Sequence, residues 1–257
     1  MVYDALFDTW DLFVRAMKKL LRTPILIFLS LFQALLFLFL FTQIFSKFGG
    51  LPGFPAGGYL QFATAGILLF PAMTASTQSG NSMVDDINSG YLSKMLVTPV
   101  SRPAILLGRL LSDGVMTIIP TGIILVLAYL LGATFATGVP GILLIFFTLA
   151  FFEIAWSGIG LAAGLATKSQ ETVTGLGALI LIPLMFMSTA LVPLQFLPDW
   201  IQTVSNFNPI SYTANAVRAL MSTGFDWNTI IAAYAVLALV AAVTMGATLY
   251  QFRRVVK

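Results

Sequence analysis

The sequence predicts an all-α membrane protein with six transmembrane helices, an N-terminal interfacial helix and short helices in two loops. Three observations support this fold class: long apolar runs, scarce charges, and basic residues concentrated in alternate loops. Hydrophobic residues form 58% of the 257 residues and charged residues 9%, whereas soluble domains carry about 25% charged residues. The mean hydropathy is +0.95. We therefore treat residues 1–257 as a single membrane domain.

The apolar runs between charged residues locate the spans, because a helix needs roughly 20 apolar residues to cross a bilayer. The interval from Asp113 to Glu153 holds two spans, since its GATFATGVPG segment is typical of a turn. None of the runs shows the alternating polarity of a membrane strand. The predicted spans are Ile25–Phe45, Tyr59–Ser79, Ala104–Leu131, Gly141–Ala166, Thr172–Leu194 and Thr229–Gln251.

Basic residues predict the orientation, because Lys and Arg concentrate in cytoplasmic loops. With a cytoplasmic N-terminus, all but two of the 13 basic residues lie inside, and the two outside are Lys47 and Arg218. We expect a multi-pass protein of the cell membrane with both termini in the cytoplasm. The net charge of +3 then needs no nucleic-acid partner. No N-x-[ST] sequon occurs, which fits a prokaryotic source.

Residues 1–22 predict an amphipathic helix lying in the cytoplasmic membrane interface, where its bases meet the headgroups. Its apolar residues recur at steps of three and four: Leu6, Trp10, Phe13, Val14, Met17, Leu20 and Leu21. This helix is either a juxtamembrane anchor or also a contact for a cytoplasmic partner.

The loop 81–103 is the long cytoplasmic loop, and it predicts a short amphipathic helix ending near Val97. The helix stops before Thr98-Pro99, because the residue before proline disfavours helical geometry. Its apolar face comprises Val84, Ile87, Tyr91 and Met95, and the polar residues are Asp85, Asp86, Ser89 and Lys94. At the start of the third span, Arg109 and Asp113 are four residues apart, and we expect them to pair.

Polar and small residues inside the spans suggest helix contacts. Glu153 lies near the middle of the fourth span, where a charge is costly. It is either a polar point on a substrate path or a helix–helix lock, satisfied through Gln33 or a Ser or Thr of a neighbouring helix. Gly160-x-x-x-Gly164 favours close packing, within the chain by default and at a dimer seam as the alternative.

The segment 195–228 lies outside and is too interrupted to cross, so it is read as re-entrant or interfacial. Two short helices are expected, Asp199–Asn206 and Ile210–Ser222, broken at Asn208-Pro209. Arg218 either reaches the headgroups or pairs with Asp199 or Asp226. The aromatic residues fit an interfacial belt or a substrate gate.

Absent residue types exclude most catalytic chemistry. The chain has no Cys and no His, so thiolate metal sites, cysteine nucleophiles and histidine bases are excluded. It lacks the G-x-x-x-x-G-K-[ST] loop of P-loop ATPases. The sequence therefore predicts neither a catalytic nor a metal site.

Two stretches carry a resemblance to ABC-2 type transporter permeases, closest to the daunorubicin-resistance branch. The run DDINSGYLSKMLVTPVSRPAILLGRLLSD resembles the cytoplasmic loop of that family. The stretch from FLPDW to AVRAL resembles its last extracellular region. The outer residues that match are Leu197, Pro198, Trp200, Asn208, Pro209, Tyr212 and Arg218.

The resemblance implies a permease dimer, with itself or a related permease, above two ATPase subunits that hold ATP and Mg²⁺. The cytoplasmic helix would be the coupling helix that receives the ATPase motion. The residues implied in coupling are Val84, Asp85, Asp86, Ile87, Ser89, Gly90, Tyr91, Leu92, Met95, Thr98, Pro99 and Arg102. A hydrophobic or amphipathic cargo, drug-like or lipid, would move outward along the dimer axis.

Three other functions stay open from the residues. The same fold would serve export of a lipid-linked glycan. An ion-coupled secondary transporter would show internal repeats or several intramembrane charges, and this chain shows neither beyond Glu153. A membrane scaffold would have no use for the cytoplasmic helix.

Overall fold

The computed structural model describes residues 10, 13–15, 17–18, 24–50, 52, 54–55, 57–96 and 102–255, and it contains no strand in these ranges. The longer helices are α2 (Pro24–Ile44), α3 (Gly58–Ile67), α4 (Leu69–Asn88), α6 (Arg102–Met116), α7 (Ile118–Leu130), α8 (Gly138–Thr167), α9 (Gln170–Phe186), α11 (Pro209–Ser222) and α12 (Trp227–Val255). The shorter elements are η1 (Ser46–Gly50), α5 (Tyr91–Leu96), η2 (Leu194–Phe196) and α10 (Asp199–Ser205).

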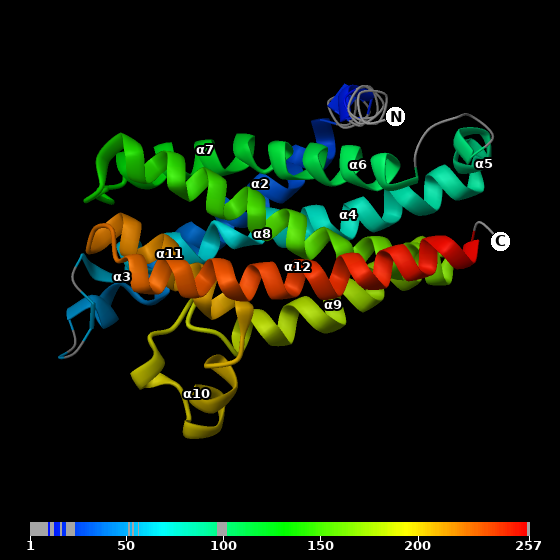
Figure 1. Cartoon of the computed structure of the whole chain (residues 1–257). Helices are drawn as coiled ribbons and strands as arrows, with labels where there is room; N and C mark the ends of the chain where they lie inside the picture. The colour runs from blue at the N-terminus through cyan, green and yellow to red at the C-terminus, as the bar shows by residue number, and fades with distance from the viewer. Residues whose placement is uncertain are drawn as a thin grey trace.

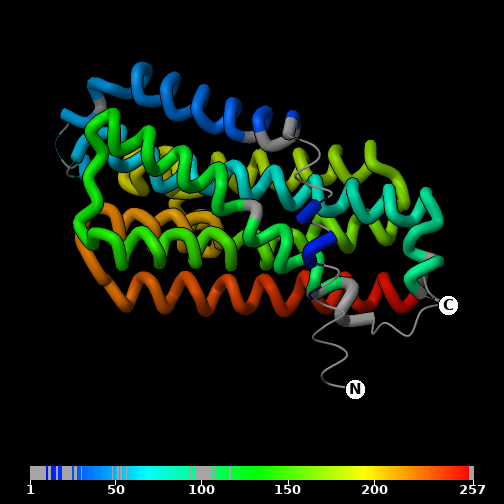
Figure 2. Tube along the Cα trace, turned by 90° about the horizontal axis from the view of Figure 1, so that it is seen from above, coloured from blue at the N-terminus to red at the C-terminus, as the bar shows by residue number. Residues whose placement is uncertain are grey.

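The helix α8 forms the centre of the bundle and packs against α4 on one side and α12 on the other (Figures 1 and 2). Its core residues Phe152 and Trp156 are fully enclosed and stack with ring centroids 5.0 Å apart. They belong to one large apolar cluster that also takes side chains from α2, α3, α7, α11 and α12. Tight packing of α8 on both sides is therefore the basis of the fold.

The contact between α4 and α8 depends on glycine. A Cβ on Gly160 would lie 2.1 Å from the carbonyl oxygen of Ser76, and one on Gly80 would lie 2.4 Å from that of Gly160. Only hydrogen at these positions lets the two backbones approach so closely. The predicted within-chain role of Gly160 and Gly164 is confirmed, because a Cβ on Gly164 would also lie 2.7 Å from the Gly80 carbonyl oxygen.

Two of the predicted spans are each divided into two helices. The second span consists of α3 and α4, and the third of α6 and α7. Proline explains both divisions: Pro71 and Pro120 cannot donate to the carbonyls of Ile67 and Met116, four residues earlier, where α3 and α6 end.

Among the described residues, four helical segments are long and apolar enough to cross a membrane: Gly58–Asn88, Gly108–Leu130, Gly138–Thr167 and Trp227–Arg254. They correspond to the second, third, fourth and sixth predicted spans. The fifth span appears as a shorter apolar helix, Gln170–Phe186, and the apolar stretch Leu31–Ile44 belongs to the 21-residue helix α2, which corresponds to the first predicted span. Large apolar side chains are exposed along α2, α7, α9 and α12, which is the surface expected of a multi-pass membrane protein.

The fifth predicted span is too long at its end. The helix α9 stops at Phe186, eight residues before the predicted Leu194. Side chains from α11 and the residue before it replace the missing helix bonds: Asn208 donates to the carbonyls of Leu184 and Met187, at 2.6 and 3.1 Å. A helix can end inside a bundle when such donors satisfy its last carbonyls.

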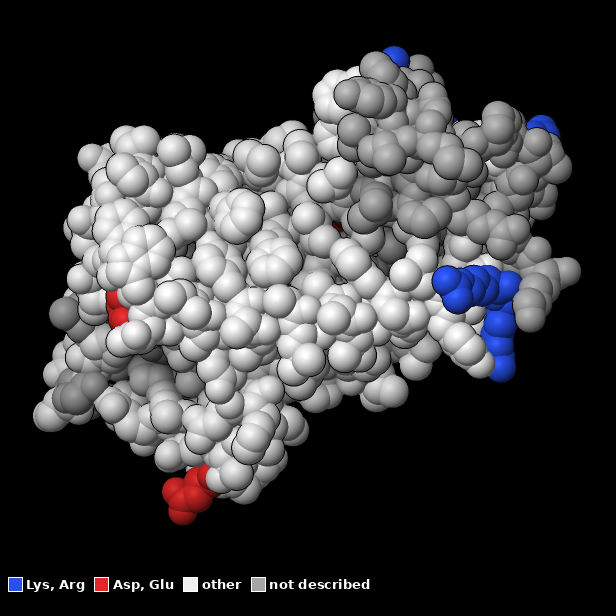
Figure 3. Space-filling view, in the orientation of Figure 1, with Lys and Arg blue, Asp and Glu red and all other residues white. Residues whose placement is uncertain are grey.

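The two ends of the bundle differ in composition. The turn from α4 to α5 and the end of α12 lie at one end, and α3 and α11 lie at the other (Figure 1). Lys and Arg side chains gather toward the α5 end, and most of the acidic atoms seen on this face lie toward the opposite end (Figure 3). Of the predicted N-terminal helix 1–22, residues 10, 13–15 and 17–18 are helical, and the rest lies outside the described residues.

Candidate functional site

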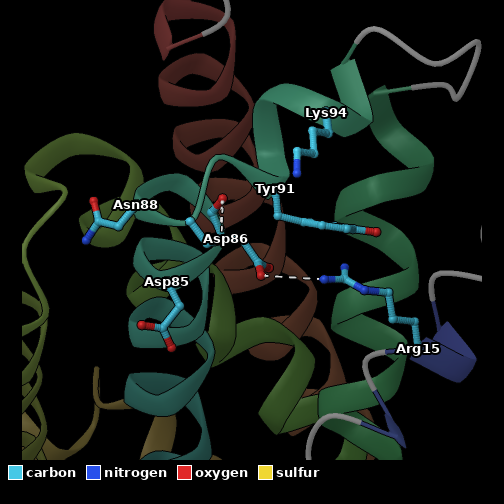
Figure 4. Close-up of a pocket in the computed structure, with 7 residues that line it drawn as sticks. Arg15, Asp85, Asp86, Asn88, Tyr91 and Lys94 are labelled. Carbon is cyan, nitrogen blue, oxygen red and sulfur yellow. Dashed lines mark hydrogen bonds and ion pairs between the residues drawn. The ribbon is translucent and has the colours of Figure 1, made fainter.

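An open pocket of about 700 Å³ lies where α4 ends and α5 begins (Figure 4). We call it the α4–α5 pocket. Its lining combines both charge signs with an aromatic ring and comes from the N-terminal segment, α4, the following turn and α5. The lining residues are Arg15, Asp85, Asp86, Asn88, Ser89, Tyr91 and Lys94.

Asp86 joins three parts of the chain at this pocket. Its Oδ2 lies 2.9 Å from Arg109 Nη1 of α6, and its Oδ1 lies 3.8 Å from Arg15 Nη2 of the N-terminal segment. The side chains of Asp86 and Arg109 are only 11% and 13% exposed. A salt bridge so shielded from water is costly to break, because removal of one partner leaves a buried charge. Arg109 therefore forms its ion pair with Asp86, and no ion pair with Asp113 is found among the described residues.

Arg15 also contacts α5 through the ring of Tyr91, with its guanidinium carbon 3.3 Å from the ring centroid. Figure 4 shows Arg15 reaching toward both Tyr91 and Asp86. The turn at Ser89-Gly90 brings α5 into place, and Gly90 adopts a φ of +70°, which favours glycine. The cation–π contact and the ion pair together tie the N-terminal segment to the α4–α5 turn.

The rim of the pocket is polar and accessible. Asp85, Asn88, Ser89 and Lys94 are exposed. Asp85 accepts a hydrogen bond from the Gln170 side chain at the start of α9. The pocket thus offers a partner an acidic group, a basic group and an amide on one surface.

The apolar residues predicted as an exposed face lie mostly inside the chain. The predicted single helix is instead two: α4 continues to Asn88, and α5 turns away after Gly90. Val84 is fully buried, Leu92 and Met95 are 3% and 8% exposed, and Ile87 and Tyr91 are partly buried. Side chains from α6, α8 and α12 cluster with Ile87, Tyr91, Leu92 and Met95, including Leu106, Leu110, Leu161, Leu165 and Phe252.

Three other predicted coupling residues are only partly described. Thr98 and Pro99 lie outside the described residues, and Arg102 begins α6 without a described side chain.

Glu153 is fully buried in α8 and finds its partner on its own helix. The Ser157 hydroxyl donates to Glu153 Oε1 at 2.7 Å, and Oε2 has no hydrogen-bond partner among the described residues. Gln33 is exposed on α2, so it is not the partner expected from the sequence. Asp113, on α6, accepts a hydrogen bond from Ser79 of α4.

At the opposite end, the predicted helices are confirmed as α10 and α11, broken at Asn208-Pro209. Asn208 caps α11, with its Oδ1 accepting from the Ile210 N–H at 3.0 Å. The Tyr212 hydroxyl donates to the Asn206 carbonyl at 2.9 Å. Pro198 precedes α10, and Trp200 is 58% exposed, as expected of an aromatic residue in a membrane interface.

Arg218 pairs with neither aspartate considered from the sequence. Its Nη2 donates to the Thr189 carbonyl at 2.8 Å and its Nη1 to Asn215 Oδ1. Asp226 instead caps α12: hydrogen bonds from the Thr229 hydroxyl and N–H groups hold the pKa of Asp226 below its ordinary range. Asp199 is exposed at the start of α10.

The described residues contain no group of three or more His, Cys, Asp or Glu side chains that could hold a metal ion. Sequence reasoning missed that Arg15 and Arg109 both face Asp86, because these residues are far apart along the chain. Arg15 was visible only as one base on the polar face of the N-terminal segment.

Comparison with known proteins adds an independent finding. A family model described as ABC-2 type transporter matches residues 8–222. The chain is similar to the daunorubicin resistance ABC transporter permease protein DrrB1 of Streptomyces coeruleorubidus, 30% identical over 80% of this chain and 72% of the relative. It is 31% identical to the putative transport permease ycf38 of Cyanophora paradoxa, over 84% of this chain and 76% of the relative. A probable doxorubicin resistance ABC transporter permease protein, DrrC of Mycobacterium tuberculosis, is 30% identical to this chain. The match covers 62% of this chain and 57% of the relative.

Proposed function

This chain belongs to the ABC-2 type transporter family, and we propose that it is the membrane-spanning permease subunit of an ATP-driven exporter. The ATPase is a separate subunit, which binds the ATP and Mg²⁺. The chain lacks a P-loop of its own, and proteins similar to it are permease subunits by name.

The observation that carries the proposal is the α4–α5 pocket. Asp86 connects the N-terminal segment to α4 and α6, and α4 packs along α8 at the centre of the bundle. A push on the pocket would therefore be transmitted to the central helices, because packed helices move as rigid elements. The exposed Asp85, Asn88 and Lys94 are the residues we assign to contact with the ATPase.

The active unit in this proposal contains two permeases, each with six spans and cytoplasmic termini. The surface of α9 supports a second copy: only Val173 and Met185 of its 17 residues are buried. The helix α2 is similarly exposed, with Phe28, Phe32 and Phe39 each more than half accessible. In this arrangement α11, packed against α3, α8 and α12, forms the re-entrant segment on the outer side.

The cargo class we propose is a hydrophobic or amphipathic compound, drug-like or lipid, that moves outward. The names of two relatives refer to daunorubicin and doxorubicin resistance. The large apolar side chains exposed along α2 and α9 fit the passage of such a compound between apolar helices.

The test is purification of the chain from its native membranes in mild detergent, followed by identification of copurifying proteins by mass spectrometry. We expect a P-loop ATPase in a one-to-one ratio with the chain. We also expect ATPase activity in the purified complex to respond to amphipathic compounds.

Two charge reversals locate the contact. Lys94→Glu changes an exposed residue of the α4–α5 pocket, and Lys47→Glu makes the same change on an exposed residue of η1 at the opposite end. We expect the ATPase to be lost with Lys94→Glu and retained with Lys47→Glu. Loss of the ATPase from both variants, or from neither, would contradict the assignment of the α4–α5 pocket as the docking site. Absence of any ATPase from the wild-type preparation would contradict the proposal that this chain is part of an ATP-driven exporter.

A further inference from the structure

A second cavity, of about 360 Å³, lies at the opposite end from the α4–α5 pocket. We call it the α10–α11 pocket. Its lining comes from α3, α10, α11 and the stretch that follows α9. Phe62, Pro193 and Leu194 supply an apolar wall, and Asn206, Asn215 and Arg218 supply polar groups. The cavity is at the small end of the range for ligand sites, which suits a headgroup.

Arg218 is the charged residue that lines this cavity, and no carboxylate lies within ion-pair distance of it in the described part of the chain. Its contacts are neutral: the carbonyls of Thr189 and Ala190, the Asn215 side chain, and the ring of Phe62, 3.7 Å from the guanidinium carbon. The neighbouring aspartate, Asp226, caps α12. The cavity therefore carries a positive charge that has no counterion among the described residues.

Hydrogen-bond donors remain unused around this charge. A guanidinium has five N–H donors, and those of Arg218 that have described acceptors come from Nη1 and Nη2. Its Nε is buried and without a partner. Asn215 Oδ1 accepts from both Arg218 and Thr189, so its amide nitrogen is left as a donor in the same cavity.

Burial of an unpaired charge is unfavourable, and an anion with its own acceptor oxygens relieves that cost. Arginine is suited to this pairing, because its planar fork matches the oxygens of phosphate and carboxylate. The apolar wall beside the cation suits the first carbons of an attached chain. These groups together match the junction between an anionic head and an apolar tail.

We propose that the α10–α11 pocket is a binding site for a phosphate group, with Arg218 as its counterion and Asn215 as an additional donor. The apolar wall favours a phosphate carried by a lipid headgroup, and free phosphate presents the same chemistry. The inference concerns binding and does not depend on the proposed export activity, so either can fail without the other.

The test uses the full chain purified in zwitterionic nanodiscs, without any ATPase. Three probes are titrated: dihexanoyl phosphatidic acid, dihexanoyl phosphatidylcholine and inorganic phosphate. Binding is followed by calorimetry and by the rise in Tm that a ligand of the folded state produces. We expect the phosphatidic acid to bind at least tenfold more tightly than the phosphatidylcholine. Saturable binding of inorganic phosphate with equal affinity would assign the site to the free anion, and weaker binding would assign it to the headgroup.

The decisive variant keeps Arg218 and supplies a counterion. Asn206 lines the cavity, its side chain is exposed, and its backbone carbonyl makes the contact with Tyr212, so Asn206→Glu adds a carboxylate without removing that bond. We expect Asn206→Glu to weaken phosphatidic acid binding at least tenfold and to raise the Tm of the free protein. Asn206→Gln is the neutral control, and Thr203→Glu adds the same charge to α10 outside the lining. Both control variants should bind phosphatidic acid with an affinity within twofold of that of the wild type.

Two results would overturn the site. One is equal binding of phosphatidylcholine and phosphatidic acid, which would show that the phosphate charge is not recognised. The other is unchanged binding by Asn206→Glu, or an equal loss in Thr203→Glu, which would place any anion elsewhere. Arg218→Lys is a second check: it keeps the charge but not the fork, and we expect weakened binding in a protein that still folds.

Discussion

At the scale of single residues, two adjacent aspartates have opposite environments. Asp85 is exposed and accepts from the Gln170 side chain, and Asp86 is buried against Arg109 and Arg15. A helix separates neighbouring residues by 100°, so one side chain faces the bundle and the next faces outward. Both were expected to belong to the same contact region, and their different roles follow from side chains on other segments.

The ion pair predicts unequal effects of two equivalent substitutions. Asp86→Asn leaves the Arg109 charge unpaired at a shielded position, and we expect it to lower the free energy of unfolding by about 3 kcal/mol. Asp85→Asn changes an exposed carboxylate, and we expect an effect within about 0.5 kcal/mol. Denaturation of the two purified variants in the same detergent measures the difference. Equal effects would show that the Arg109 pair contributes nothing specific to stability.

The environment of Glu153 predicts that the negative charge of its carboxylate is not needed for stability. The carboxyl is fully buried and one of its oxygens has no described partner, so the neutral amide of Glu153→Gln removes the cost of a membrane-buried charge while keeping the acceptor for Ser157. We expect thermal stability equal to the wild type or higher.

Ser157→Ala is the companion variant for Glu153. It removes the donor and should lower the free energy of unfolding by about 1 kcal/mol. Strong destabilisation by Glu153→Gln would show that the ionised carboxylate has a stabilising partner.

At the scale of helices, the approximate positions of most helices were predictable from the sequence, and the residues at which most of them end were not. The predicted first span differs from α2 by one residue at each end, because an apolar run bounded by charges is a local signal. The divisions at Leu68 and Thr117 were also readable, since Pro71 and Pro120 lie at fixed steps beyond them. The early end of α9 was not readable, because Asn208 and Arg218, which satisfy the carbonyls there, come from another element.

The glycine contact between α4 and α8 predicts a position-dependent effect of one methyl group. In Gly160→Ala the new Cβ meets a backbone carbonyl at 2.1 Å, so the helices must separate, at a cost of about 1–3 kcal/mol. In Gly246→Ala on α12 nothing lies within 4 Å, so better helix propensity should leave stability unchanged or higher. The measurement is the melting temperature of each variant, compared in the same detergent. A Gly160→Ala protein as stable as Gly246→Ala would mean that the α4–α8 contact is loose.

At the scale of the whole molecule, the two ends present different chemistry to the two sides of a membrane. One end carries the α4–α5 pocket and the basic C-terminal turn of α12, and the other carries the α10–α11 pocket and exposed aromatics such as Trp200 and Phe207. This polarity fits a basic cytoplasmic side. Assignment of α9 as a full span rests on the sequence pattern, because it is a shorter apolar helix of 17 residues.

Cysteine labelling tests the orientation together with the crossings of α3–α4 and of α9, and the chain has no cysteine to interfere. Single substitutions are made at the exposed positions Lys47, Lys94, Glu171 and Asp199. We expect an impermeant maleimide to label Lys47→Cys and Asp199→Cys in sealed cells, and Lys94→Cys and Glu171→Cys only after permeabilisation. Labelling of Lys47→Cys and Lys94→Cys from the same side would show that the span formed by α3 and α4 does not cross the membrane. Glu171 and Asp199 on the same side would show that α9 does not cross.

The membrane class, the approximate place of each helix and the break at Asn208-Pro209 were all determined by local composition. Apolar length, charge gaps and proline act over a few residues, so their consequences are visible along the chain. The partners of the polar groups were settled by packing: Asp86 with Arg109, Glu153 with Ser157, and Arg218 with carbonyls beyond α9. The same holds for Val84 and Met95, which were expected on one apolar face of a loop helix. Both are buried, Met95 in a cluster with side chains of α6, α8 and α12. An apolar face is buried by whatever surface the fold brings to it, and local pattern does not say whether that surface belongs to the same chain.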